Sequence, residues 1–331
     1  MSLCPYTLRK VTELPPREAW SVITTFTWNL FSSPVHTDDS SVEEVVDRDK
    51  QLSALEAVLS GAAWDLWTDF ADVVPSASQG LIDFWHSTPD GKAILVLDGL
   101  SLRESPWLQA QAKQRGFQVL KQGCKTSELP GETTAFAKAL GFGQRSLLSN
   151  NGAGASHPFA GAVTESSDLP WHDCIALVSA KPNVVFWHHW PDNRLHDNSA
   201  PGAGLPKHLR EVRAGLMSDD FWAFVARLAT GRRLVITSDH GYAACGQFPD
   251  VTDASQAAYA KSLFRSQRHS ADTSEEGPWI PPLDVRLISS NGSNRYVLGR
   301  RKWKMPSGYP TLQHGGLSLL EVLVPFFEIS T

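Results

Sequence analysis

Short continuous apolar runs recur through the last three-quarters of the chain, each about as long as a buried strand. The first spans residues 93–97 and ends in Asp98-Gly99. Further runs follow at 117–120, 184–187, 234–237, 285–289 and 322–327. Segments with helical spacing of apolar residues lie between them, at 106–115, 133–140 and 219–228. This alternation predicts an α/β fold, in which helices cover both faces of a parallel sheet.

The first quarter of the chain has a mostly helical pattern instead. Between Arg17 and Trp85, apolar residues recur at helical spacing, and the segment 40–44 (Ser-Ser-Val-Glu-Glu) is a helix-start signal. The turn signal Asp90-Gly91 separates this part from the first apolar run. We therefore predict a helical N-terminal extension at residues 1–90 and a catalytic α/β domain at residues 91–331.

Two long stretches interrupt the alternation within the second part. Residues 198–209 are rich in Gly and Pro, and residues 245–282 are mostly polar around a short helical piece at 254–266. Long loops in compact domains are usually functional or disordered. We predict that both stretches are lids or insertions around a site.

Composition narrows the class of protein. A net charge of -5 argues against non-specific coating of nucleic acid, but nucleic acid could still be a substrate where metal ions supply positive charge. The twelve Trp are expected mainly in the core. The four Cys have no C-x-x-C spacing, which excludes a zinc finger and fits a reducing compartment. Because neither a signal peptide nor a membrane-length apolar stretch is recognisable, we predict a soluble, cytoplasmic protein.

Residues able to bind a metal follow several of the predicted strands. Asp98 follows the first run, and Asp239-His240-Gly241 follows the run at 234–237. Asp192 and His196 are four apart, a spacing that places them on one face of a helical turn. His314 precedes two glycines before the last run. Each alone has an ordinary explanation as a turn, cap or loop residue, but together they predict a site for zinc or manganese at the strand ends.

This order of motifs resembles the alkaline-phosphatase-like superfamily and, within it, the PglZ domain family. The similar region covers residues 92–328, and the segment 314–325 is its most PglZ-like piece. The resemblance implies a three-layer sandwich with a mostly parallel central sheet. It also implies two divalent metal ions, Zn²⁺ or alternatively Mn²⁺. One would be held by Asp98, Asp239 and His240, and the other by Asp192, His196 and His314.

The resemblance further implies a hydroxyl nucleophile at a helix start. Residues 129–134 (Leu-Pro-Gly-Glu-Thr-Thr) match this place, and the family's Pro-x-x-Thr spacing selects Thr133, with Thr134 as the alternative. A metal ion would lower the pKa of the hydroxyl, and a helix start offers N–H groups to a phosphate. The ordinary alternative is that Thr133 only caps the helix.

Other polar residues near these motifs are weaker candidates. We expect His188 and His189 to be packing residues. We expect Arg103, Lys302 and Lys304 to lie on solvated faces rather than on a substrate phosphate. Asn150 and Asn151 lie roughly where some superfamily members bind phosphate.

The predicted function is a metal-dependent phosphohydrolase, more specifically a phosphodiesterase that acts on nucleotides or nucleic acid through attack by Thr133. PglZ proteins are associated with phage-resistance systems of the BREX type, so the resemblance also implies partners among defence proteins. One alternative is a non-catalytic metal-binding scaffold or interaction module of a defence complex. Another is a transferase or mutase that uses the same site.

Overall fold

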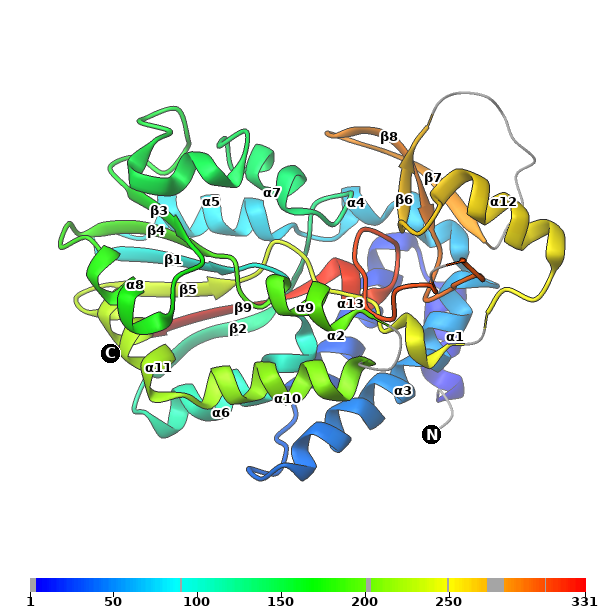
Figure 1. Ribbon diagram of the computed structural model, residues 1–331, viewed down its shortest axis with the longest axis horizontal. Coiled ribbons are helices and arrows are strands. Elements are labelled where there is room, and N and C mark those ends of the chain that lie inside the picture. The colour runs from blue at the N-terminus through cyan, green and yellow to red at the C-terminus, as the bar shows by residue number, and fades with distance from the viewer. Residues whose placement is uncertain (1–3, 90, 201–203, 249, 273–282, 307) are drawn as a thin grey trace.

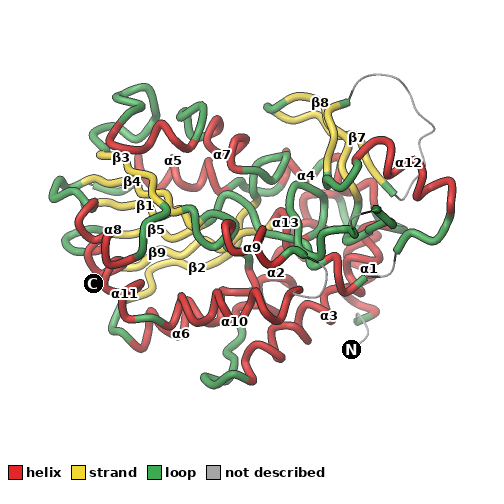
Figure 2. Tube along the Cα trace, viewed as in Figure 1, coloured by secondary structure: helices red, strands yellow, loops and turns green. Residues whose placement is uncertain are grey.

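The centre of the molecule is a six-stranded sheet of order β2-β9-β5-β1-β4-β3 (Figures 1 and 2). The computed structural model describes residues 4–89, 91–200, 204–248, 250–272, 283–306 and 308–331. Five strands of this sheet run in one direction, and β9 is antiparallel to both of its neighbours. The strands are β1 (Lys92–Leu97), β2 (Gln118–Thr126), β3 (Val163–Ser167), β4 (Asn183–His188), β5 (Arg233–Thr237) and β9 (Leu323–Ser330).

Helices cover both faces of this sheet. In β1, Ala93 and Leu95 pack into one core, whereas Ile94 and Val96 pack into another on the opposite face. Because both faces of the strand are buried, its sequence is a continuous apolar run. The predicted α/β sandwich of three layers is therefore confirmed. The first core includes α2 (Pro16–Ser32), α6 (Ser105–Gln114), α10 (Gly204–Met217) and α11 (Asp219–Ala229); the second includes α5 (Ala77–Ser87) and α7 (Thr133–Ala139).

The N-terminal segment is helical, as predicted, and it packs into the first core through residues such as Trp20 and Leu55. Its remaining helices are α1 (Pro5–Glu13), α3 (Ser40–Ser60), η1 (Trp64–Thr68) and α4 (Phe70–Val73). Asp49 of α3 forms a buried ion pair with Arg103, at 2.9 Å. The expectation that Arg103 lies on a solvated face is therefore wrong, because its side chain is fully buried against this partner. The boundary near residue 90 stays a prediction, and Asp90 lies outside the described residues.

A second, three-stranded antiparallel sheet lies beside the first. It has the order β6-β8-β7, with β6 (His269–Ala271), β8 (Gly292–Val297) and β7 (Asp284–Ser289). The prediction that the run at 285–289 joins the parallel sheet is wrong. This run is only half buried, and Ile288 is 76% exposed, so one face of β7 meets solvent. The run at 117–120 also differs from a buried strand, because β2 is a largely exposed edge strand.

The two predicted insertions are partly described. Residues 204–209 begin α10, and residues 245–272 form η4 (Cys245–Gln247), α12 (Ala254–Phe264) and β6; residues 201–203, 249 and 273–282 lie outside the described residues. The other short helices are η2 (Leu102–Glu104), η3 (Arg145–Asn151), α8 (Trp171–Leu177), α9 (Asp192–Asn198) and α13 (Leu319–Val322). Within the described part of the chain, no helix is both long and apolar enough to cross a membrane.

Candidate metal centre

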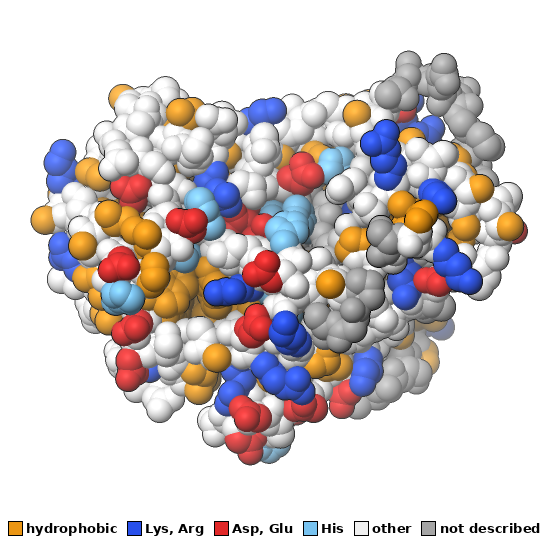
Figure 3. All heavy atoms as spheres, in the orientation of Figure 1, with side chains coloured by type: hydrophobic (Ala, Val, Ile, Leu, Met, Phe, Trp, Pro, Cys, Tyr) orange, Lys and Arg blue, Asp and Glu red, His pale blue; other side chains and the backbone are white. Residues whose placement is uncertain are grey.

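The predicted metal ligands gather at one edge of the central sheet, where the parallel strands end. Asp98 directly follows β1, and Asp239 and His240 follow β5 after one residue. Asp192 is the first residue of α9, after β4. Because β9 runs in the opposite direction, the segment before it, which contains His314, reaches this same edge. Figure 3 shows histidine, acidic and basic side chains together in the middle of this face.

Glycines allow the segments at this edge to approach one another closely. Gly99 has a φ of +74°, and a Cβ there would lie 3.1 Å from the Cβ of Asp192. A Cβ at Gly241 would overlap the carbonyl oxygen of Leu320. Without these Cβ atoms the segments come close, and the amide of Asp192 donates a hydrogen bond to the Asp98 carbonyl oxygen at 2.9 Å. Gly99 and Gly241 therefore place the ligand-bearing strand ends against their neighbours.

The first group of candidate ligands is Asp98, Asp239 and His240, all fully buried. The Nε2 atom of His240 lies 3.5 Å from Asp98 Oδ1 and 3.6 Å from Asp239 Oδ2. Asp239 Oδ1 accepts hydrogen bonds from the amides of Gly99 and His240, both at 3.0 Å. These bonds fix the carboxylate, so its other oxygen faces the group.

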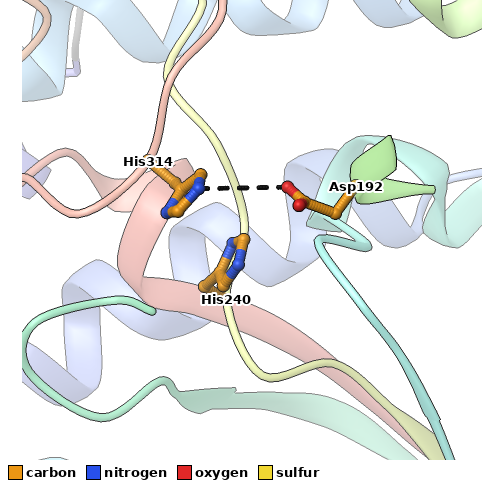
Figure 4. Close-up of side chains that lie close together, drawn as sticks. All are labelled: Asp192, His240 and His314. Carbon is orange, nitrogen blue, oxygen red and sulfur yellow. Dashed lines mark ion pairs between the residues drawn. The ribbon is translucent and has the colours of Figure 1, made fainter. Parts of the chain in front are cut away.

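The second group is Asp192, His240 and His314 (Figure 4). His314 Nε2 lies 3.9 Å from Asp192 Oδ1, and the rings of His240 and His314 stack with centroids 4.0 Å apart. His196 lies beside this group, with its Nε2 3.2 Å from Asp192 Oδ2 and its side chain 63% exposed. His240 thus belongs to both groups, whereas His196 stands at the solvent side of the second.

The hydrogen bonds of the two stacked histidines favour metal binding. His240 Nδ1 lies 3.0 Å from the carbonyl oxygen of Gly241, and His314 Nδ1 lies 3.0 Å from that of Gly131. A carbonyl oxygen only accepts, so each Nδ1 carries a proton and each Nε2 is turned toward the carboxylates. His240 Nε2 and Asp192 Oδ1 are buried without a hydrogen-bond partner. Carboxylates and imidazoles in this arrangement fit a divalent ion such as zinc.

The pKa values of the ligand residues in the metal-free protein also favour binding of a cation. Burial, together with the charge of Asp98, raises the pKa of Asp239 to about 6. Burial disfavours the charged form of His240, but the negative charges of Asp239, Asp192 and Asp98 raise its pKa to about 10. Burial and the charge of His240 lower the pKa of His314 to about 4. The site therefore holds excess negative charge, which a bound cation would neutralise while displacing the His240 proton.

Thr133 lies at the first ligand group. Its Oγ1 is 3.0 Å from Asp239 Oδ2 and 3.3 Å from Asp98 Oδ1. It is the first residue of α7, whose N-cap is Glu132, so the hydroxyl is directed to the carboxylates rather than used as a cap. Thr134 is exposed, and no hydrogen bond ties its side chain to the described ligands.

Arg145 is a residue of the site that the sequence did not reveal. Its guanidinium forms an ion pair with Asp98 Oδ2, and its side chain is 27% exposed. It lies on η3, in a polar segment that follows no strand and matches none of the quoted motifs. Asn151, considered as a phosphate ligand, instead accepts a hydrogen bond from the amide of Thr164 at 3.2 Å and so stabilises the start of β3.

The loop before Thr133 is held by the small sheet. The carbonyl oxygen of Leu129 accepts hydrogen bonds from Ser289 Oγ at 2.8 Å and from Asn291 Nδ2 at 3.2 Å. The carbonyl of Gly131, two residues on, orients His314. One loop therefore positions both the candidate nucleophile and a candidate ligand.

A buried ion pair holds the loop after His314. Glu321 and Arg268 pair at 2.9 Å, and both side chains are fully buried. Glu321 Oε1 also accepts from the amide of Gly316 at 2.8 Å. Because Arg268 comes from the segment before β6, the inserted region stabilises the His314 loop. The Gly315-Gly316 motif identified in the sequence gave no sign of this partner.

The other weak candidates from the sequence lie outside the two ligand groups. His188 is buried; its Nε2 lies 2.9 Å from the Leu169 carbonyl oxygen, and its Nδ1 accepts from the amide of Trp190 at 3.1 Å. Its expected packing role is confirmed. His189 Nε2 lies 3.0 Å from Ser166 Oγ. Lys302 pairs with Asp250 at 3.4 Å, and Lys304 is exposed.

Comparisons with known proteins gave matches to solved structures alone. No protein-family model and no curated protein sequence matches it. Among solved structures, murine ectonucleotide pyrophosphatase / phosphodiesterase 5 aligns with 72% of this chain and 88% of its own, at 12% identity and a TM-score of 0.40. An inactive variant of the same murine protein in complex with AMP aligns with 73% and 88%, at 12% identity and a TM-score of 0.41. Similarity at this level assigns no function to the chain.

Proposed function

We propose that this chain is a metal-dependent phosphohydrolase that cleaves phosphate diesters with Thr133 as its nucleophile. The observation that supports this most strongly is the position of Thr133 Oγ1, within 3.3 Å of both Asp98 and Asp239. A threonine alcohol is a poor nucleophile unless its pKa is lowered, and a group of carboxylates and imidazoles able to hold a metal ion lies beside it. The motif order that resembles the PglZ domain family points to the same chemistry.

Two ions, zinc or manganese, would occupy the two ligand groups. Asp98, Asp239 and His240 would hold one, and Asp192 and His314 would hold the other with His196. When bound, such ions supply Lewis acidity that activates an alcohol and stabilises a departing oxygen.

The chain's own residues account for the remaining steps. Asp98 and Asp239 orient the Thr133 hydroxyl, whose oxygen attacks phosphorus as the bond to the leaving alcohol breaks. The hydroxyl proton ends on that alcohol. Water then cleaves the phosphothreonine, which releases a phosphate monoester and restores Thr133. Arg145, paired with Asp98 in the protein alone, would hold a non-bridging phosphate oxygen once Asp98 is neutralised by a cation.

The finer parts of the proposal rest on the family resemblance. A nucleotide or nucleic acid is the proposed substrate, and the proposed setting is a cytoplasmic phage-resistance assembly with other defence proteins as partners. A non-catalytic scaffold is the second hypothesis from the sequence. A scaffold has no need of a nucleophile beside its ligands, so the presence of Thr133 next to Asp98 and Asp239 favours catalysis.

The deciding experiment compares two esters and two threonines. Bis-p-nitrophenyl phosphate and p-nitrophenyl phosphate would be assayed with Zn²⁺, Mn²⁺ or chelator on wild type, Thr133→Ala and the matched control Thr134→Ala. We expect preference for the diester, loss of turnover with chelator and a loss of at least ~10³-fold in Thr133→Ala alone, at unchanged metal content.

Chelator-insensitive turnover, or full activity of Thr133→Ala, would overturn the mechanism. Absence of both bound metal and turnover, with either ester and with DNA or RNA, would favour the scaffold hypothesis.

A further inference from the structure

A cavity of about 610 Å³ is lined in part by α9, the helix that begins with Asp192 of the second ligand group. Its apolar wall is formed by Leu169, Pro170, Trp171 and Trp190, and Asn193 of α9 is among its polar residues. This volume is within the range of pockets that bind small molecules. None of the residues assigned above to catalysis lines it, so it is separate from the metal centre.

The cavity and the metal centre share one helix. Trp190, in the cavity wall, is separated from Asp192 by a single residue. Asp192 and His196 contact each other on one face of α9, whereas Asn193 and Arg194 line the cavity. Figure 3 shows apolar side chains beside the central histidine and acidic cluster on the same face. A molecule held by its phosphate at the second ligand group could therefore extend over the start of α9 into the cavity.

The walls are aromatic and held in place. The rings of Trp171 and Trp190 meet edge to face, with centroids 5.4 Å apart, and Trp171 packs on His188 at 3.9 Å. Trp190 lies over Gly215, where a Cβ would come within 2.7 Å of its Cζ2. Flat aromatic faces of this kind bind flat rings by stacking.

The charged residues of the cavity argue against a phosphate and for a neutral ring. Asp168 and Glu211 are acidic and Arg194 is basic, so the cavity has no excess of positive charge. Asn193 and Arg194 can donate hydrogen bonds, and Asp168 can accept them. His188 offers only its ring, because both of its nitrogens already bond to backbone. A nucleobase, which has both donors and acceptors on its edge, matches this combination.

We propose that this cavity binds a nucleobase of the substrate, on the side of the metal centre formed by α9. The assignment rests on the proposed phosphodiesterase function for the phosphate beside it, and it specifies the substrate as a nucleoside ester. Trp190 supplies a stacking face, and Asn193 and Arg194 recognise the base edge.

The first test measures binding without chemistry. Adenosine, which lacks a phosphate, would be titrated calorimetrically into the full chain in chelator, with ribose as the comparison. We expect saturable binding of adenosine and none of ribose. Ala214→Phe should weaken adenosine binding at least ~10-fold, because Ala214 lines the cavity and a phenyl ring would fill it without removing any packing. The matched control Ala176→Phe, at an exposed position of α8 outside the cavity, should leave binding unchanged.

The second test separates this assignment from the proposed function. In Ala214→Phe, kcat/KM should fall at least ~10-fold for thymidine 5′-p-nitrophenyl phosphate and stay unchanged for methyl p-nitrophenyl phosphate. Hydrolysis of both esters without adenosine binding, or with equal loss in Ala176→Phe, would overturn the nucleobase assignment and leave the phosphodiesterase standing. Adenosine binding that Ala214→Phe abolishes, without hydrolysis of any ester, would support the cavity and overturn the catalytic function.

Discussion

Two of the places where this molecule buries carboxylates neutralise the charge in opposite ways. Between α3 and the rest of the protein, Asp49 contacts Arg103 at 2.9 Å and Arg300 at 2.8 Å, and all three side chains are at most 1% exposed. At the sheet edge, Asp98 and Asp239 are also fully buried. The arginine that pairs with Asp98 there, Arg145, is however 27% exposed and is shared between the site and solvent.

This difference in partners distinguishes a carboxylate of the scaffold from the carboxylates of the candidate site. A buried carboxylate that meets buried guanidinium groups is already compensated, and its removal leaves uncompensated positive charge. Buried carboxylates close to one another without such partners raise each other's pKa and attract a cation. The two arginines at Asp49 therefore compensate its charge within the protein, whereas Asp239 has a raised pKa and belongs to a group of residues that could hold a cation.

Asp239→Asn should have the largest effect and should act in opposite directions on activity and on stability. Because a metal contributes several kcal/mol of charge stabilisation, we expect turnover to fall by at least ~10⁴-fold and metal content to fall with it. In chelator at pH 8, the metal-free protein should melt higher than wild type, because the cost of burying the ionised Asp239, together with its repulsion from Asp98, is removed. Elemental analysis, ester turnover and thermal melts measure the three effects. Unchanged metal content, or a lower melting temperature in chelator, would contradict the idea that a bound cation neutralises the buried Asp239 carboxylate.

Asp49→Asn should do the reverse, with a large cost in stability and little effect on the chemistry of the folded protein. Leaving Arg103 and Arg300 buried without their carboxylate should lower the free energy of unfolding by about 3–5 kcal/mol. The matched control is Asp47→Asn on the same helix, whose carboxylate is 65% exposed, and its effect should stay within about 0.5 kcal/mol. Urea unfolding measures both. Equal stabilities of the two variants would show that the buried pair is not structural.

The same contrast explains how much of the molecule could be predicted from its sequence. The central strands were found because burial on both faces makes each a continuous apolar run, and β7 was misplaced because a half-buried strand can contain a similar run. The edge strand β3 was missed because its sequence, Val-Thr-Glu-Ser-Ser, is mostly polar. In each case the error concerns which face meets solvent, which depends on the neighbouring elements.

Whether a site residue could be predicted depended on how far its partners lie along the chain. Asp239 and His240 were found because a strand end and its ligands are adjacent in sequence. Arg145 was missed because its partner, Asp98, is 47 positions away. Arg103 was misjudged for the same reason, since Asp49 is 54 positions away. Pairing across the fold decides whether an arginine is buried in the scaffold or faces the candidate site, and no local pattern in the sequence records that pairing.

Arg145→Ala tests the intermediate case, an arginine that pairs with a site carboxylate and still reaches solvent. If it holds a phosphate oxygen, KM and the inhibition constant of inorganic phosphate should each rise about 10–100-fold, as expected for a hydrogen bond to a charged group. Metal content should be unchanged, and Arg145→Lys should recover part of the loss. Arg115→Ala, at a surface ion pair with Asp219, is the control and should change neither constant. A loss confined to metal content would assign Arg145 to the support of Asp98 instead.

The smallest effects should come from the two hydrogen bonds that the small sheet donates to the loop before Thr133. Ser289 and Asn291 both donate to the carbonyl oxygen of Leu129, so either one can hold the loop when the other is removed. We expect kcat to fall less than about two-fold in Ser289→Ala or Asn291→Ala and about ten-fold in the double variant, with KM and metal content unchanged.

The control for this pair is Ser293→Ala on the same hairpin, because its hydroxyl bonds to Asp272 rather than to the loop. Single-turnover rates measured at saturating ester would report the position of the Thr133 hydroxyl separately from binding. An additive double variant would mean that the two donors act independently, and a larger combined loss would mean that they substitute for each other. A double variant as active as Ser293→Ala would show that the loop before Thr133 keeps its position without these two hydrogen bonds.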